Sequence, residues 1–310
     1  MSTPFRNLRV WRLDAPWTKS AEEIDEALQA DAFQPCAPGQ AESLGWEAPA
    51  QGAEIFARQL GDAILLRTRC QERVLPARAV AEAMAERLPE LEAREGGPIR
   101  GALRRELADT VRAELLPHAP LQSTRNWILI DRSAGLILID SATASTCESL
   151  LSLLRGSLGN LGVRPLAFAR PIDGSLTTWL TSGDLPAGFE LGRWADLEHP
   201  QDTGNQVRFR GQPLDEDEVT ATLDRGLRVT ALELLWHAGA DEPLRFVLGE
   251  DGSFRRVRIP GELLEDQSDR ETEQDRLDAD LTLVHLSLGR LFRALFPALG
   301  GVATESITPA

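Results

Sequence analysis

The chain has 310 residues, which is enough for two domains or several packed layers, and its apolar content of 42% is ordinary for a globular protein. It contains no run of 18 uncharged apolar residues, and its N-terminus lacks the apolar core of a signal peptide. Three widely spaced cysteines argue against a disulfide framework and against a CxxC metal site. We therefore expect a cytoplasmic protein with no membrane partner.

The net charge of −15 argues against a nucleic-acid partner, but this charge is unevenly distributed. Residues 262–280 carry nine acidic residues and two arginines, and residues 22–31 carry five acidic residues and no basic one. These two segments hold 12 of the 15 net negative charges, so the rest of the chain is close to balanced. Because a local basic patch decides whether a phosphate backbone is attracted, DNA binding stays open.

The first thirty residues predict a strand and a helix. Residues 8–13 alternate between apolar and polar side chains, as a strand with one buried face does. Ser20 is placed to cap a helix whose apolar positions include Ile24 and Leu28, and the acidic residues in its first turn suit the positive end of the helix dipole.

Residues 34–51 are rich in Pro, Gly and Ala and predict a loop, in which Trp46 contacts the core. Residues 53–58 and 63–69 predict two strands that turn at Gly61-Asp62. The chain then changes to a helical period over residues 76–116, and the break at Gly96-Gly97-Pro98 divides this segment into two helices. Two helices joined by such a turn predict a helical hairpin that projects from the sheet.

The middle of the chain is the unit around which we expect the rest to be arranged. Two apolar runs, residues 128–130 and 136–139, flank a polar loop that ends in Gly135, which predicts a β-hairpin. Residues Ser145 to Glu148 have the composition of a capping box, and leucines at helical spacing follow until Gly159 ends the helix. Nothing in this unit is chemically reactive, so it predicts scaffold.

The last third of the chain has a looser pattern. Residues 183–206 contain several Gly and Pro residues and predict loop and linker with short helices. Beyond them the pattern predicts a strand over 207–210, a helix over 214–223, strands over 229–236, 244–248 and 254–259, and a C-terminal helix through Leu281, Val284, Leu288, Leu291 and Leu295. In the last strand, alternation places Arg256 and Arg258 on one face, opposite Arg255.

No known catalytic motif is present. The only lysine, Lys19, has no glycines before it, which excludes a P-loop, and the four histidines are widely separated. Asp275, Asp278 and Asp280 are residue types that hold Mg²⁺ in two-metal nucleases, but a solvated acidic helix face is the simpler interpretation. We expect no catalytic residue, no metal and no cofactor.

Arginine clusters are the remaining signal, and 32 of the 33 basic residues are arginine. Each cluster alone is most simply a solvated face, but three together favour a common basic surface. They lack aromatic interleaving and a base-reading motif, so any binding would be directed at phosphates and blind to sequence. The clusters are Arg100, Arg104, Arg105 and Arg112 on the second helix of the hairpin, Arg208 and Arg210, and Arg255, Arg256 and Arg258.

The chain resembles the RdgC family of bacterial recombination-associated proteins from end to end. The matching stretches occur in order, with nearly constant spacing, across about 300 residues. They are FRNLRVWRLDAPW, DAFQPCAP with SLGW, AILLRTR, RVLPARAV, LIDRSAGLILID, ESLLSLLRGSLGNLGVRPL, LTTWL, GFELG, VRFRGQPL, RRVRIP, DRLDADLTL and LGG.

The resemblance implies a homodimer closed into a ring around double-stranded DNA. It implies a largely sequence-independent binder that hydrolyses no nucleotide, restrains RecA-promoted strand exchange and associates with the nucleoid. An acidic exterior with a basic hole would reconcile the net charge with DNA binding. The implied fold is α+β with mainly antiparallel sheets, in a horseshoe-shaped monomer: a central domain of residues 1–75 and 117–180, a helical tip of residues 76–116 and a C-terminal base domain of residues 181–310.

Individual positions follow the family pattern unevenly. The stretch VRFRGQPL supplies Arg208, Arg210 and Gln212, although the family often has Lys where this chain has Gly211. Near Gly226 the family usually has a further Lys, and Arg228 is the candidate that restores this charge. The predicted DNA-binding residues are therefore Arg100, Arg104, Arg105, Arg112, Arg208, Arg210, Gln212, Arg228, Arg256 and Arg258.

The dimer gate differs most from the family. After Leu115-Leu116-Pro117 the family commonly presents Arg-Ala-Phe, and its Phe acts as a finger at the gate. This chain has His118, Ala119 and Pro120 followed by Leu121. The predicted gate residues are His118, Pro120 and Leu121, with Leu121 in place of the aromatic side chain.

Two functions of other classes stay open. One is a metal-dependent nuclease that uses the acidic residues of 275–280. The other is an acidic adaptor that binds a basic protein through residues 262–280 and does not contact DNA.

Overall fold

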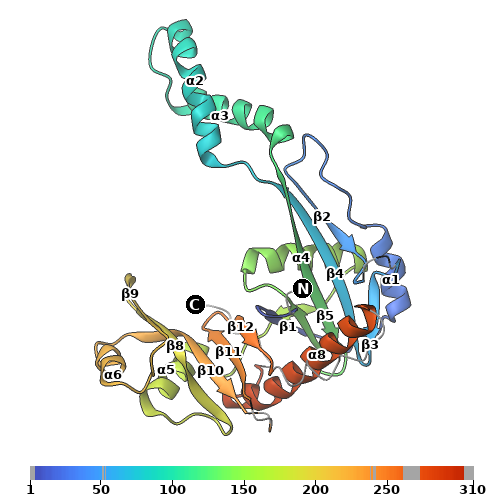
Figure 1. Ribbon diagram of the computed structural model, residues 1–310, viewed down its shortest axis with the longest axis vertical. Coiled ribbons are helices and arrows are strands. Elements are labelled where there is room, and N and C mark those ends of the chain that lie inside the picture. The colour runs from blue at the N-terminus through green and yellow to red at the C-terminus, as the bar shows by residue number, and fades with distance from the viewer. Residues whose placement is uncertain are drawn as a thin grey trace.

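A computed structural model describes residues 4–50, 52, 54–237, 239, 242–260 and 273–303, with the side chains of residues 273–276 left out of the description. It confirms an α+β fold with two antiparallel sheets (Figure 1). In the first sheet the strand order is β2-β4-β5-β6-β1-β7, and β3 also pairs with β4. Its strands are β1 Arg9–Leu13, β2 Glu42–Glu47, β3 Ala57–Leu60, β4 Ala63–Arg73, β5 Leu121–Asp131, β6 Leu136–Ile139 and β7 Val163–Pro165.

The first sheet is buried on both faces in the half of its strands that carries the apolar core residues. One face carries Ile64, Ile128 and Ile137, which pack with helices α1 (Ala21–Gln29) and α4 (Ala144–Leu158). The other face carries Leu65 and Leu129, which belong to a larger core shared with the second sheet. Burial on both faces explains why the predicted hairpin strands have continuous apolar runs.

Helices α1 and α4 test the two capping predictions. Ser20 caps α1 as predicted: its Oγ accepts the Glu23 backbone N–H at 3.2 Å, and the Glu23 carboxylate accepts the Ser20 N–H at 2.7 Å. The capping box at Ser145 was wrong, because α4 begins two residues earlier, with Thr143 at its N-cap and no side-chain cap. Gly159 ends α4, as predicted, and has a φ of +83°, which glycine adopts readily.

The N-terminal loop prediction was wrong in part. Residues 42–47 form β2 within the segment predicted as loop, and Gly45 in this strand lies so close to the backbone of Phe33 that a Cβ atom would be 2.6 Å from its Cα. A glycine that permits close backbone packing was thus mistaken for a loop signal. The strand predicted over 53–58 is also displaced and begins at Ala57.

The helical hairpin is confirmed. Helices α2 (Ala77–Glu95) and α3 (Gly101–Leu115) stand beyond the far ends of β4 and β5, away from both sheets (Figure 1). β4 and β5 pair along all eleven residues of each strand, from Ala63 opposite Asp131 to Arg73 opposite Leu121. The half nearest the helices extends past the core, since residues 121–125 are all exposed.

The second sheet has the strand order β12-β11-β10-β8-β9. The prediction of loop over 183–206 was wrong in part: residues 183–188 form no strand or helix, but the rest of the segment forms most of the long β8–β9 hairpin. Gly188, Gly192 and Gly204 lie within or beside these strands rather than in a linker. The elements are α5 Ile172–Ser182, β8 Phe189–His199, β9 Asp202–Arg210, α6 Asp217–Leu223, β10 Arg228–Trp236, β11 Leu244–Gly249, β12 Phe254–Arg258 and α8 Glu273–Ala298.

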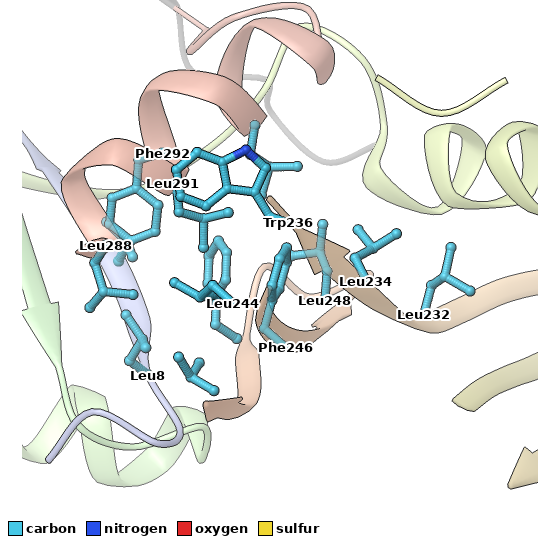
Figure 2. Packing of buried hydrophobic residues seen from close by; sticks show 14 of the residues in the cluster. Leu8, Leu232, Leu234, Trp236, Leu244, Phe246, Leu248, Leu288, Leu291 and Phe292 are labelled. Carbon is cyan, nitrogen blue, oxygen red and sulfur yellow. The ribbon is translucent and has the colours of Figure 1, made fainter. Parts of the chain in front are cut away.

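The predicted apolar positions of the C-terminal helix are all buried. Leu288, Leu291 and Phe292 of α8 pack against the inner face of the second sheet, together with Leu8 from the N-terminal segment (Figure 2). Among the described residues, none of the helices is long and apolar enough to cross a membrane.

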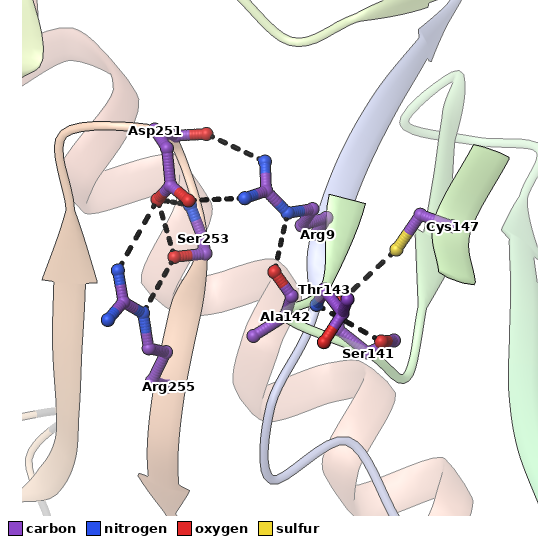
Figure 3. A network of polar contacts seen from close by, with 8 residues as sticks. All are labelled: Arg9, Ser141, Ala142, Thr143, Cys147, Asp251, Ser253 and Arg255. Carbon is purple, nitrogen blue, oxygen red and sulfur yellow. Dashed lines mark hydrogen bonds and ion pairs between the residues drawn. The ribbon is translucent and has the colours of Figure 1, made fainter. Parts of the chain in front are cut away.

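Residues 5–9 join the two sheets. Leu8 and Phe254 exchange backbone hydrogen bonds of 2.7 and 2.8 Å, so the chain before β1 pairs with the edge strand β12. The guanidinium of Arg9 binds the Asp251 carboxylate and carbonyl on one side and, at 2.8 Å, the Ala142 carbonyl on the other (Figure 3). This joint fixes how the second sheet sits on the first.

Asp140 lies beside this joint and generates a pH prediction. Burial raises the pKa of Asp140 to about 6, although the N–H groups of Phe5 and Asn7 lower it. A carboxyl whose pKa is higher in the folded than in the unfolded chain binds its proton more tightly in the folded state. Its contribution to stability is therefore fully present below about pH 4 and is lost as the pH rises through about 6.

We expect Asp140→Asn to raise the free energy of unfolding at pH 7, by at most about 3 kcal/mol, because the variant has no buried charge at this position. It should also flatten the pH dependence between about pH 4 and pH 6. Urea unfolding at pH 4.5 and pH 7 measures both effects. A variant that is less stable than the wild type at pH 7 would contradict the prediction.

Candidate nucleic-acid interface

Two of the three predicted arginine clusters meet around Trp194. The guanidinium carbon of Arg210 on β9 lies 3.7 Å from the centroid of the Trp194 ring, and that of Arg256 on β12 lies 4.2 Å from it. The quadrupole of an indole ring attracts a cation that lies over its face, and indole is the strongest aromatic partner for arginine. A stacked guanidinium keeps its N–H groups at its edge, where they can bind phosphate oxygens.

The stack extends across most of the second sheet. Trp194 lies on β8 and Arg256 on β12, and strands β10 and β11 are between them. The two side chains must therefore cross the face of the sheet to meet. Strand alternation places this face opposite the one that carries Leu232, Leu234 and Phe246 of the core.

A bulge in β8 positions Trp194. The residue pairs on either side are Leu191 with Leu234 and Ala195 with Leu232, so Gly192, Arg193 and Trp194 lie opposite the single residue Glu233. The buried Glu233 carboxylate accepts the Arg193 N–H at 2.7 Å. Gly192 is required here, because a Cβ atom would lie 2.5 Å from the Glu233 Cγ.

A second bulge, in β12, positions Arg256 and corrects the predicted alternation. Arg255 pairs with Val247 and Arg258 pairs with Arg245, so Arg255 and Arg258 share a face and Arg256 is the extra residue. Arg256 has a φ of +54°, and its N–H donates to the Asn7 side chain at 3.0 Å. The N-terminal joint thus holds the backbone from which Arg256 reaches Trp194.

Other predicted residues surround the stack. Arg208 and Arg210 are exposed on β9 while Phe209 between them is buried, as the predicted alternation requires. Arg210 donates to Asp196 Oδ1, and the Trp194 Nε1 donates to the same oxygen at 3.2 Å. Arg258 is exposed and Gln212 is half-buried. Arg245, which the sequence did not single out, is exposed opposite Arg258.

Arg228 has a different environment. Its guanidinium contacts three carboxylates: Glu250 at 2.6 Å, Asp173 at 2.8 Å and Glu198 at 3.8 Å. Hydrogen bonding to Asp173 raises the pKa of Arg228, although burial lowers it. Carboxylates already surround this cation, so a phosphate would have to compete with them.

The third cluster lies apart from the stack. Arg100, Arg104, Arg105 and Arg112 are exposed on the hairpin helices, which Figure 1 shows remote from β8 and β12. Arg112 pairs with Asp109 at 2.8 Å. The DNA-binding role of these four residues stays a prediction.

The predicted gate residues lie where the hairpin returns to the sheet. His118, Pro120 and Leu121 are exposed, and Leu121 exposes 46% of its surface. The guanidinium of Arg73 stabilises this connection, since it donates hydrogen bonds to the carbonyls of Pro117 at 3.0 Å and Ala119 at 3.2 Å. The gate role also stays a prediction.

The acidic residues proposed for a metal lie at the start of α8. Asp278 pairs with Arg58, and Asp280 is half-buried. No group of three or more His, Cys, Asp or Glu residues that could hold a metal occurs in the part of the chain that the structure describes. The side chain of Asp275 and the acidic residues 262–271 lie outside it.

Known proteins match this chain over nearly its whole length. The family model described as "Putative exonuclease, RdgC" matches residues 4–302. The recombination-associated protein RdgC of Edwardsiella ictaluri is 36% identical over 305 residues, which cover 97% of this chain and 99% of that protein. The protein of the same name from Salmonella typhimurium is 34% identical over 302 residues, which cover 96% of this chain and 98% of that protein. The chain belongs to the RdgC family of recombination-associated proteins.

Proposed function

We propose that this protein binds double-stranded DNA through its phosphates, largely without regard to sequence and without enzymatic turnover. The stack of Arg210, Trp194 and Arg256 carries the proposal, because it brings together exposed guanidinium groups from two strands, β9 and β12, of an acidic chain. Arg208 and Arg258 extend the same surface. No exposed aromatic ladder or base-reading helix accompanies these residues in the described part of the second sheet, which favours backbone contacts over base readout.

The family resemblance supports a larger assembly. We propose a homodimeric ring that encloses the duplex, with the hairpin α2–α3 at the dimer contact and the second sheet at the base. The exposed Leu121 would serve at the gate in place of the family's aromatic finger. On DNA within the nucleoid, such a ring would obstruct the growth or strand exchange of RecA filaments, which accounts for an association with recombination.

A second candidate function rests on the description of the matching family model as a putative exonuclease. Incubation of linear and circular duplex with the protein and Mg²⁺, with and without chelator, tests it. Cleavage that chelator abolishes and that Asp278→Asn and Asp280→Asn reduce would establish the nuclease and overturn the non-enzymatic proposal. An acidic adaptor would instead fail to shift plain duplex at low salt.

The first prediction concerns the basic surface. Replacement of both Arg208 and Arg210 by Ala should weaken binding to all duplex sequences about equally and lower the slope of log affinity against log salt by about 2. Fluorescence anisotropy with several unrelated duplexes measures both quantities. Retention of wild-type affinity by this variant would place the interface elsewhere.

The second prediction separates stacking from charge. Trp194→Ala leaves every charge in place but removes the ring that orients two guanidiniums, so we expect DNA affinity to fall by up to about tenfold. Trp194→Phe keeps an aromatic face and should retain most of the affinity. If Trp194→Ala bound DNA as tightly as the wild type, with unchanged folding by circular dichroism, the stack would have no part in binding.

The third prediction concerns the ring. The free protein should have the solution mass of a dimer, and it should stay on circular duplex after a challenge with high salt while it slides off linear duplex. Leu121→Glu should favour the monomer and remove the difference between circles and linear DNA, because it places charge at the contact. Light scattering and pull-down of circular and linearised plasmid measure these effects. A wild-type monomer would refute the ring.

A further inference from the structure

Three arginines converge on Glu47, far from the stack around Trp194. Arg125 binds both carboxylate oxygens of Glu47, with Nε 2.6 Å from Oε2 and Nη2 3.1 Å from Oε1. Arg67 Nε lies 3.3 Å from Oε2, and Arg69 Nη1 lies 3.5 Å from Oε1. We call Arg67, Arg69 and Arg125 the arginine triad. With Glu47 it has a net charge of +2.

The register of the first sheet produces this cluster. Glu47 on β2 lies opposite Arg67 on β4, and Arg69 lies opposite Arg125 on β5. Like charges directly across two strands repel, so an anion between them is needed. Two of the guanidiniums also rest on aromatic rings, Arg67 at 5.2 Å from the Trp127 centroid and Arg69 at 4.5 Å from the Phe33 centroid.

The cluster is open to solvent on the extended half of β4 and β5. Arg125 exposes 46% of its side chain, whereas Glu47 exposes 20% and Arg67 17%. Strand alternation places Arg67 and Arg69 on the same face of β4 as Leu65, but beyond the core and toward the helical hairpin. The site is therefore half-enclosed and cationic.

The anion that the arginine triad holds is the carboxylate of Glu47. Carboxylate and phosphate both accept paired hydrogen bonds from guanidinium groups, so the site that holds Glu47 has the chemistry of a phosphate site. Burial raises the pKa of Glu47, but the hydrogen bond from Arg125 and the charges of the triad outweigh this effect and lower it. Glu47 is consequently ionised at neutral pH.

Resting on the proposed function, we propose that the arginine triad is a second binding site for a phosphate of the duplex backbone, and that Glu47 occupies this site in the free protein. A phosphate displaces the carboxylate from Arg125, the most exposed of the three, while Arg67 and Arg69 stay stacked on their rings. Because Glu47 competes with the phosphate, it weakens DNA binding. When no DNA is present, its negative charge offsets the repulsion among the three guanidinium groups of the triad.

Removal of the competitor tests this inference. Glu47→Gln in the full-length chain should bind duplex about three- to tenfold more tightly than the wild type and should steepen the slope of log affinity against log salt by up to about 1. The matched control is Asp14→Asn, which deletes the same charge from an ion pair with Arg164 on β7, the edge strand at the other end of the sheet from β2. The control should change affinity much less.

Removal of the most exposed cation is the complementary test and does not depend on the folding of the Glu47 variant. Arg125→Gln should lower DNA affinity and reduce the salt slope by about 0.9, the value for one phosphate contact, whereas Arg164→Gln should have a smaller effect. If Glu47→Gln does not fold, the comparison of these two variants decides.

The two proposals fail in different ways. If wild-type protein does not bind duplex even at low salt, the proposed function is refuted. If wild-type protein binds with a steep salt dependence, but the triad variants match their charge controls, the function stands and the second phosphate site is refuted.

Discussion

The pairing of residues 5–9 with β12 is the contact on which the rest of the structure depends. It converts two separate sheets into one body, because Leu8 and Phe254 continue the hydrogen bonding from β1 to the edge of the second sheet. The apolar core then extends without interruption from Leu65 and Leu129 through α8 to Phe246. The same segment supplies Asn7, which binds the backbone of Arg256, so the first residues of the chain help to place a cation in the proposed interface.

The placement of the arginines explains how an acidic chain can offer a surface to a polyanion. Some guanidiniums are used within the fold: Arg9 joins the sheets and Arg228 lies among three carboxylates. Others rest on aromatic rings: Arg256 and Arg210 lie over Trp194, where Arg210 also pairs with Asp196. The net charge counts all of these equally, whereas the field at a surface depends on how many cations are exposed and close together there.

The sequence predicted the elements whose pattern is local. The helical hairpin, the central β-hairpin and the buried stripe of α8 have regular periods, and the structure confirms them. The β8–β9 hairpin was missed because its glycines serve bulges and close contacts, as Gly192 does beside Glu233. The site was predicted in part: Arg210 and Arg256 were named, but their meeting at Trp194 depends on strand order and on two bulges. No short-range sequence pattern encodes the strand order or the bulges.

The attachment of the hairpin α2–α3 has a mechanical consequence. Only two stretches of chain connect these helices to the body, one after β4 and one before β5. The guanidinium of Arg73, at the end of β4, donates to the carbonyls of Pro117 and Ala119 on the returning stretch and of Ala37 in the body. The Val74 N–H donates to the Pro120 carbonyl at 2.9 Å and joins the two stretches directly. The helices therefore form a lever whose base is stiffened by the Arg73 side chain and by this backbone hydrogen bond. Any load applied at the far end of the lever would be concentrated on these hydrogen bonds.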